Sequence, residues 1–179
     1  MAEGIELPEG HHGHEDSPFL VPVSVTISVL AVLVAGVTLL GHRAHTEELL
    51  LQSQATDQWA YYQAKNLRSH QYQSVADLLA VLAAQDKEKA EAMREKYAKE
   101  TERYEGDKED ISEKAKELEK ERDMVGHRAD RFDGGEGLIE VGLVICSMTL
   151  LTKRRFYWIA GILIAAGGLA FAATAFLIH

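Results

Sequence analysis

Proline and cysteine are scarce in this chain of 179 residues. The three prolines are Pro8, Pro18 and Pro22, so no proline interrupts a helix from Val23 onwards. The one cysteine, Cys146, lies in an apolar run and excludes an internal disulfide. No stretch shows the alternation of apolar and polar residues that half-buried strands need. The sequence therefore predicts an all-α protein.

Charge is absent from two long segments, although charged residues make up 26% of the chain. Residues 19–40 and 156–178 contain no Asp, Glu, Lys or Arg. A helix over 19–40 is about 33 Å long and matches a hydrocarbon core of roughly 30 Å. We expect an integral membrane protein with transmembrane helices at 19–41, 134–152 and 156–178. The lipid bilayer is then its first partner.

Signs of catalysis and of nucleic-acid binding are also lacking. The net charge of −9 opposes contacts with phosphates. No nucleophile elbow, zinc-protease motif, phosphate-binding loop or CxxC pair occurs, so we predict no enzyme and no cofactor. An acidic tail at residues 1–18 holds a weak metal candidate, and the alternative is a solvated tail. The histidines concerned are His11, His12 and His14.

The segment 42–133 is highly charged, and its sequence predicts helix throughout. Because both of its ends meet predicted spans, we expect an antiparallel helical hairpin with its turn near 85–87. The returning arm has apolar residues spaced seven apart, which is typical of a coiled coil. Polar partner positions such as Lys108 make this seam narrow. The seam residues are Tyr97, Tyr104, Ile111, Leu118, Val125 and Phe132.

The outgoing arm is rich in uncharged polar and aromatic residues at 52–74. Trp59 and Tyr62, three residues apart, share one helix face. Such a composition indicates a polar interface with other protein groups rather than a solvated surface.

The stretch ATDQWAYYQAK at residues 55–65, with the acidic His-containing start, the charged hairpin and LLTKRRFYW at 150–158, resembles the bacterial domain-of-unknown-function family 4337. The resemblance implies a small bacterial membrane protein of three spans with no assigned activity. The chain departs from the family at AAQDK, where Pro or Gly is often found. The matching motif positions are Asp57, Gln58, Trp59, Tyr61, Tyr62, Gln63 and Lys65.

Three further features carry competing hypotheses. Glu140, in the second predicted span, is either an interface residue or, in an oligomer, part of a ring lining a cation path. His42 and His45 either sense pH or lie at the membrane surface. Small residues that share one face of the last span pack on the first span or on a second subunit. They are Gly161, Ala165, Gly168, Ala172 and Ala175.

The charges near the spans give conflicting signals about orientation. The very short basic loop at 153–155 favours the cytoplasm, whereas Arg43 follows the first span and the tail has no basic residue. The short loop predicts a periplasmic hairpin on the bacterial inner membrane.

Our leading functional hypothesis is a self-associating structural or scaffolding protein, a homo-oligomer held by Trp59, Tyr61 and Tyr62. The alternatives are a homo-oligomeric ion channel with Glu140 in its path, and a module that binds another envelope protein.

Overall fold

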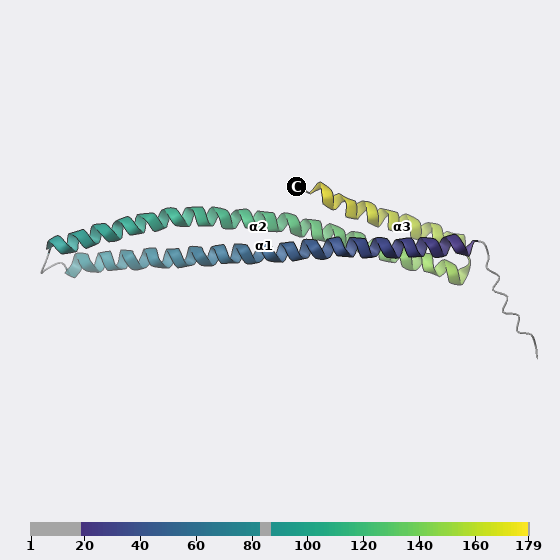
Figure 1. The fold of residues 1–179 in the computed structure, drawn as a ribbon, viewed down its shortest axis with the longest axis horizontal. Coiled ribbons are helices and arrows are strands. Elements are labelled where there is room, and N and C mark those ends of the chain that lie inside the picture. The colour runs from purple at the N-terminus through teal and green to yellow at the C-terminus, as the bar shows by residue number, and fades with distance from the viewer. Residues whose placement is uncertain (1–18, 83–86, 179) are drawn as a thin grey trace, which may run out of the picture. The chain divides into compact units, whose positions relative to one another are not determined.

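The computed structural model describes residues 19–82 and 87–178, and these fold into helices with no strand among them. Three long helices follow one another along the chain (Figure 1): α1, Leu20–Leu82, α2, Lys87–Thr152, and α3, Arg155–Ala173. A short 3-10 helix, η1, covers Thr174–Leu177. The all-α prediction is confirmed. Pro22 lies in the first turn of α1, where proline is tolerated because its missing N–H has no partner there.

By length and composition, each of the three long helices in the described part of the chain is apolar enough to cross a membrane. Large apolar side chains are widely exposed on them, for example Val32 at 72% and Leu151 at 87%. Both features are compatible with lipid as the surrounding solvent. α1 and α2, at 63 and 66 residues, are far longer than the roughly 20 residues that a span requires.

Contacts divide the described residues into two compact units, one of 19–37 with 134–172 and one of 38–133 with 173–178. In the first unit, glycines bring the backbones of α2 and α3 together. A methyl group on Gly142 would lie 2.6 Å from the Gly161 carbonyl oxygen, and one on Gly168 would lie 2.7 Å from that of Gly135. Real side chains do not fit at such distances, so these positions require glycine.

The glycines of the small-residue face of α3 lie against α2. Gly161, Ala165, Gly168 and Ala172 are buried, and the atoms nearest to Gly161 and Gly168 belong to α2. The physical reason is that Gly135 and Gly142 lie seven residues apart on α2. The smallest residues of two consecutive helices can therefore meet along one line.

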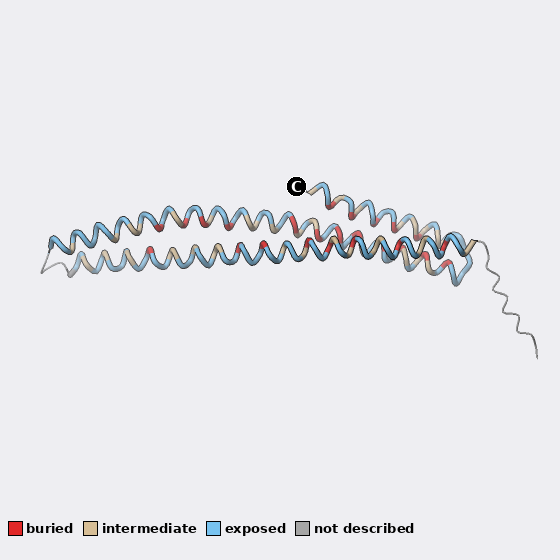
Figure 2. The backbone as a smooth tube through the Cα atoms, viewed as in Figure 1, coloured by how far each residue is buried: buried red, intermediate tan, exposed pale blue. Residues whose placement is uncertain are grey.

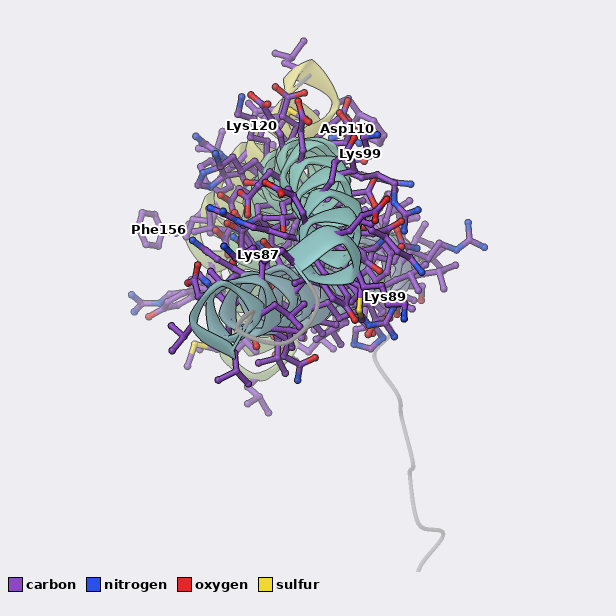
Figure 3. All side chains as sticks on the ribbon, turned by 90° about the vertical axis from the view of Figure 1, so that its left-hand side faces the viewer. Lys87, Lys89, Lys99, Asp110, Lys120 and Phe156 are labelled. Carbon is purple, nitrogen blue, oxygen red and sulfur yellow. The ribbon has the colours of Figure 1, made fainter. Side chains whose placement is uncertain are left out.

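α1 reaches the same unit through the beginning of α3. Trp158 Nε1 donates a hydrogen bond to Thr26 Oγ1 at 3.2 Å, and the Trp158 ring meets the Phe19 ring edge-on at 5.7 Å. The guanidinium of Arg155 lies 4.9 Å from the centre of the Phe19 ring. Phe156, by contrast, projects away from the ribbon (Figure 3) and is 73% exposed.

The link between α2 and α3 is a tight turn at Lys153 and Arg154. Lys153 has φ 54°, in the left-handed region that favours glycine. Its N–H donates to the Thr149 carbonyl at 2.8 Å, the single bond of a left-handed helix C-cap. A lysine therefore occupies a position where the backbone prefers glycine.

In the second unit, α1 and α2 lie side by side (Figure 1), and Figure 2 shows buried residues recurring along both. Later residues of α1 contact earlier residues of α2, from Trp59 with Glu119 to Tyr72 with Tyr97. α1 ends at Leu82 and α2 begins at Lys87, so most of the predicted turn at 85–87 lies outside the described residues. The tail 1–18 lies outside them as well.

Candidate functional site

The side of α1 that contacts α2 carries the aromatic motif residues. The half-buried Trp59 donates a hydrogen bond from Nε1 to Glu119 Oε1 at 2.9 Å. Its ring meets that of Tyr62 edge-on at 5.7 Å. We expected Trp59, Tyr61 and Tyr62 to anchor a second subunit, and two of the three, Trp59 and Tyr62, contact α2 of the same chain. Tyr61 stays 51% exposed, because two residues along a helix correspond to a rotation of about 200°.

Below these rings, polar side chains of both helices form one hydrogen-bonded cluster. Lys65 Nζ lies 2.6 Å from Asp107 Oδ2. Ser69, which is buried, donates from Oγ to Glu105 Oε1 at 2.8 Å. The cluster joins α1 to α2 through groups that neither helix satisfies alone.

Lys108 is the buried centre of this cluster, with 8% of its surface exposed. Its Nζ donates to Asn66 Oδ1 at 2.9 Å and to Glu105 Oε1 at 2.7 Å. A buried ammonium group is tolerated only when it is paired, and removing its partner is costly.

The charges of the cluster support one another. The Lys108 ammonium, and then the Ser69 hydroxyl, lower the pKa of Glu105. The hydrogen bond to Asp107 raises the pKa of Lys65. Both groups are therefore ionised at neutral pH. Their directional bonds suit the alignment of two helices, since a shifted register leaves charges unpaired.

A stack of tyrosines continues the contact beyond the cluster. The Tyr72 ring lies 5.5 Å from that of Tyr97 and 5.6 Å from that of Tyr104, with planes inclined by 24° and 16°. The ammonium of Lys65 lies 4.9 Å from the centre of the Tyr104 ring. Aromatic and cation–π contacts of this kind add specificity to burial.

The predicted seam of α2 lies on the side that faces α1, but with unequal burial. Tyr104, Ile111, Val125 and Phe132 are buried, as are the intervening Ala115 and Ala129. Tyr97 and Leu118 are half-buried.

The opposite side of α1, which we call the outer face, is exposed along its length. Its residues are spaced alternately three and four apart, and only Asp57 is charged. In α2, by contrast, charged side chains such as Lys99, Asp110 and Lys120 cover the side away from α1 (Figure 3). The outer face consists of Leu50, Ser53, Asp57, Ala60, Ala64, Leu67, Gln71, Ser74, Leu78 and Val81.

The motif residues are thus divided between the two sides of α1. Trp59, Tyr62 and Lys65 contact α2, with Gln58 half-buried. Asp57, Tyr61 and Gln63 are exposed. Sequence reasoning missed the buried cluster partners. A usable signal is that Tyr62, Lys65, Ser69 and Tyr72 are spaced three, four and three apart, as seam residues are.

Comparison with known families assigns the chain to one family. The profile of the family described as Domain of unknown function (DUF4337) matches residues 19–178. The chain belongs to this family. The predicted membership is therefore confirmed, and the DUF4337 match spans all three long helices. No curated protein and no solved structure matches the chain.

In this DUF4337 chain, Glu140 lies on an exposed side of α2 next to the exposed Val141. Within residues 19–82 and 87–178 it has no hydrogen bond or ion pair. The structure therefore does not direct this carboxylate into the packed interior of the first unit.

His45 of α1 contacts Asp133 of α2 within the second unit. Its Nε2 lies 2.9 Å from Asp133 Oδ2 and its Nδ1 lies 3.4 Å from Glu48 Oε2. The hydrogen bond to Asp133, and then that to Glu48, raises the pKa of His45 above its usual 6.5. His42 is exposed.

No group of three or more His, Cys, Asp or Glu residues suited to a metal ion occurs in the described part of the chain. The candidates His11, His12 and His14 lie outside that part.

Proposed function

We propose that the protein is a membrane-anchored scaffold in which the outer face of α1 pairs with the same face of a second copy. The observation that supports this is the exposed stripe from Leu50 to Val81, which carries a single charge and has spacing suited to a helix pair. Solvated helices carry charges on such a side, as α2 does.

The proposal includes insertion of the three apolar segments into the bilayer and an antiparallel hairpin of α1 and α2 outside it. Copies inserted in one orientation then present α1 in parallel and at the same height. The small residues Ala60 and Ala64 allow close approach of two helices at the centre of the stripe. Asp57, the one charge, would face its counterpart and limit the affinity.

The area that the two outer faces could bury sets the expected affinity of the pair. Thirty-two residues of helix extend about 47 Å, and a strip about 10 Å wide gives roughly 470 Å² for each partner. A standard stable interface buries about 800 Å² on each side. The pair therefore requires the high local concentration that a shared membrane supplies.

The decisive experiment compares two Ala→Glu variants by sedimentation equilibrium in detergent and by stepwise photobleaching in vesicles. Ala64→Glu places a charge in the outer face and is expected to give monomers. Ala98→Glu, at an exposed position of α2, is the matched control and should associate like the wild type. A wild-type chain that is monomeric in vesicles would refute self-association.

For orientation, we propose the bacterial inner membrane with the hairpin in the periplasm, supported by the short basic turn at 153–155. A membrane-impermeant lysine reagent applied to spheroplasts should label the hairpin lysines. Labelling only after lysis would reverse the orientation.

A homo-oligomeric cation channel is the second candidate, favoured by the exposed and unpaired Glu140 among the described residues. It predicts cation currents in reconstituted bilayers that are lost in Glu140→Gln. Silent bilayers containing intact, inserted protein would exclude it.

A further inference from the structure

A pocket of about 340 Å³ lies within the second unit, between residues 40–47 of α1, residues 125–132 of α2 and η1. Leu40 and Arg43 line it from α1, Arg128 and Phe132 from α2, and Phe176 from η1. Leu40 is the last residue of the apolar stretch 19–40, and Arg43 is the first charged residue after it. In an inserted protein the pocket is therefore at the level of the lipid headgroups.

The floor of the pocket is apolar and firmly packed. Phe132 and Ala175 are buried, and the Phe132 and Phe176 rings meet edge-on at 5.6 Å. Phe176 itself is 64% exposed and offers an open apolar wall. A hydrocarbon chain can lie along such a wall without displacing any packed residue.

Arg128 is held in place beside this floor. Its Nε and Nη2 both donate to the carbonyl oxygen of Ile178, at 3.0 and 2.9 Å. A guanidinium has five N–H donors, so about three remain to bind an anion. Because the side chain is already ordered, binding an anion costs little further side-chain entropy.

The rim adds one more cation and one anion. Arg43 and Glu47 are exposed, one helical turn apart, and line the pocket together. Within the described ranges 19–82 and 87–178, neither has a hydrogen bond or an ion pair. Two guanidinium groups and one carboxylate around an apolar floor match a ligand with a phosphate, an ammonium group and a hydrocarbon chain.

We propose that this pocket binds a phospholipid with a primary ammonium headgroup. The phosphate lies between Arg43 and Arg128, the ammonium pairs with Glu47, and an acyl chain follows Phe176. The site rests on the membrane insertion included in the proposed function, and it is independent of self-association.

The test uses the full chain, purified in detergent and delipidated, with binding measured by native mass spectrometry. The probes are phosphatidylethanolamine, phosphatidylglycerol, glycerophosphoethanolamine and inorganic phosphate. Wild type should bind phosphatidylethanolamine most tightly. Arg43→Gln should weaken it about five- to tenfold, as expected for one cation at a headgroup. Arg68→Gln, an exposed arginine further along α1, is the control and should bind like wild type.

Glu47→Gln separates the headgroups. It should remove the preference for phosphatidylethanolamine over phosphatidylglycerol, because the ammonium loses its partner and the anionic phosphatidylglycerol loses a like-charge repulsion. Equal affinities of wild type and Arg43→Gln would overturn the site. Inorganic phosphate binding as tightly as lipid would also overturn it, by showing a free-anion site. A monomeric chain that still shows the Arg43 effect would refute the scaffold and keep the lipid site.

Discussion

The glycine contact between α2 and α3 permits a sharp test, because two adjacent glycines of α3 have opposite surroundings. A methyl group on Gly168 would lie 2.7 Å from the Gly135 carbonyl oxygen and 2.7 Å from Leu138 Cβ. A methyl group on the neighbouring Gly167 would meet nothing within 4 Å. Gly168→Ala and Gly167→Ala thus differ in packing and in nothing else.

These distances set the expected change in the free energy of unfolding of each variant. The Gly168 methyl would lie well inside the usual 3.5–4.0 Å contact distance, against atoms close to the backbone, so the helices must separate by several tenths of an ångström. Overpacking of this kind costs about 1–3 kcal/mol. Gly167→Ala should instead gain up to about 0.5–1 kcal/mol, because alanine loses less backbone entropy in a helix. We expect the two variants to differ by about 1.5–4 kcal/mol.

The assay is unfolding by sodium dodecyl sulfate in mixed micelles, followed by circular dichroism. Gly135→Ala should be as harmful as Gly168→Ala, since its methyl would lie 2.8 Å from the Gly168 carbonyl oxygen. The double variant should cost less than the sum of the two, because one substitution has already separated the helices. Stabilities of Gly168→Ala and Gly167→Ala equal within about 0.5 kcal/mol would refute backbone contact between α2 and α3.

Three further predictions use the same unfolding assay. Lys153→Gly should stabilise the protein by about 1 kcal/mol because glycine adopts φ 54° without a steric cost; an unchanged midpoint would contradict a left-handed turn. Trp59→Phe should destabilise by about 1 kcal/mol through loss of the 2.9 Å bond to Glu119, and a neutral effect would place Trp59 elsewhere. The bond to Asp133 raises the pKa of His45 above 6.5, so the stabilisation is complete below about pH 6.5 and is lost as pH rises through the higher folded pKa. Wild type should therefore exceed His45→Gln by more at about pH 6 than at about pH 8.5, and a constant difference would remove His45 from the contact.

The class of fold was predictable because it depends on residues that are absent. No proline follows Pro22, and two segments contain no charge, so long apolar helices were expected and are found. On α2, apolar residues such as Ile111 and Val125 stand out among charged neighbours, so the side that faces α1 could be identified. These features could be predicted because the residues concerned differ in hydrophobicity from their neighbours in the sequence.

The contact side of α1 could not be read in this way, because its buried residues do not contrast with their surroundings. Ser69 is polar among other polar residues, and its burial depends on Glu105 thirty-six residues later. Hydrophobic periodicity fails when a buried position is polar and its partner is charged. Only the spacing of Tyr62, Lys65, Ser69 and Tyr72 indicates the contact.

In the apolar part of α1, too, the buried residues do not differ in hydrophobicity from their neighbours, but for another reason. Val23, Leu30, Val37, Ala44 and Leu51 are seven apart and all buried, yet the first three lie among residues that are just as apolar. When lipid is the solvent, an apolar side chain gains little by leaving it, so hydrophobicity does not select the contact side. Side-chain size and shape select it instead, and the seven-residue interval passes the end of the charge-free run without a change of phase. One packing period therefore serves α1 on both sides of that boundary.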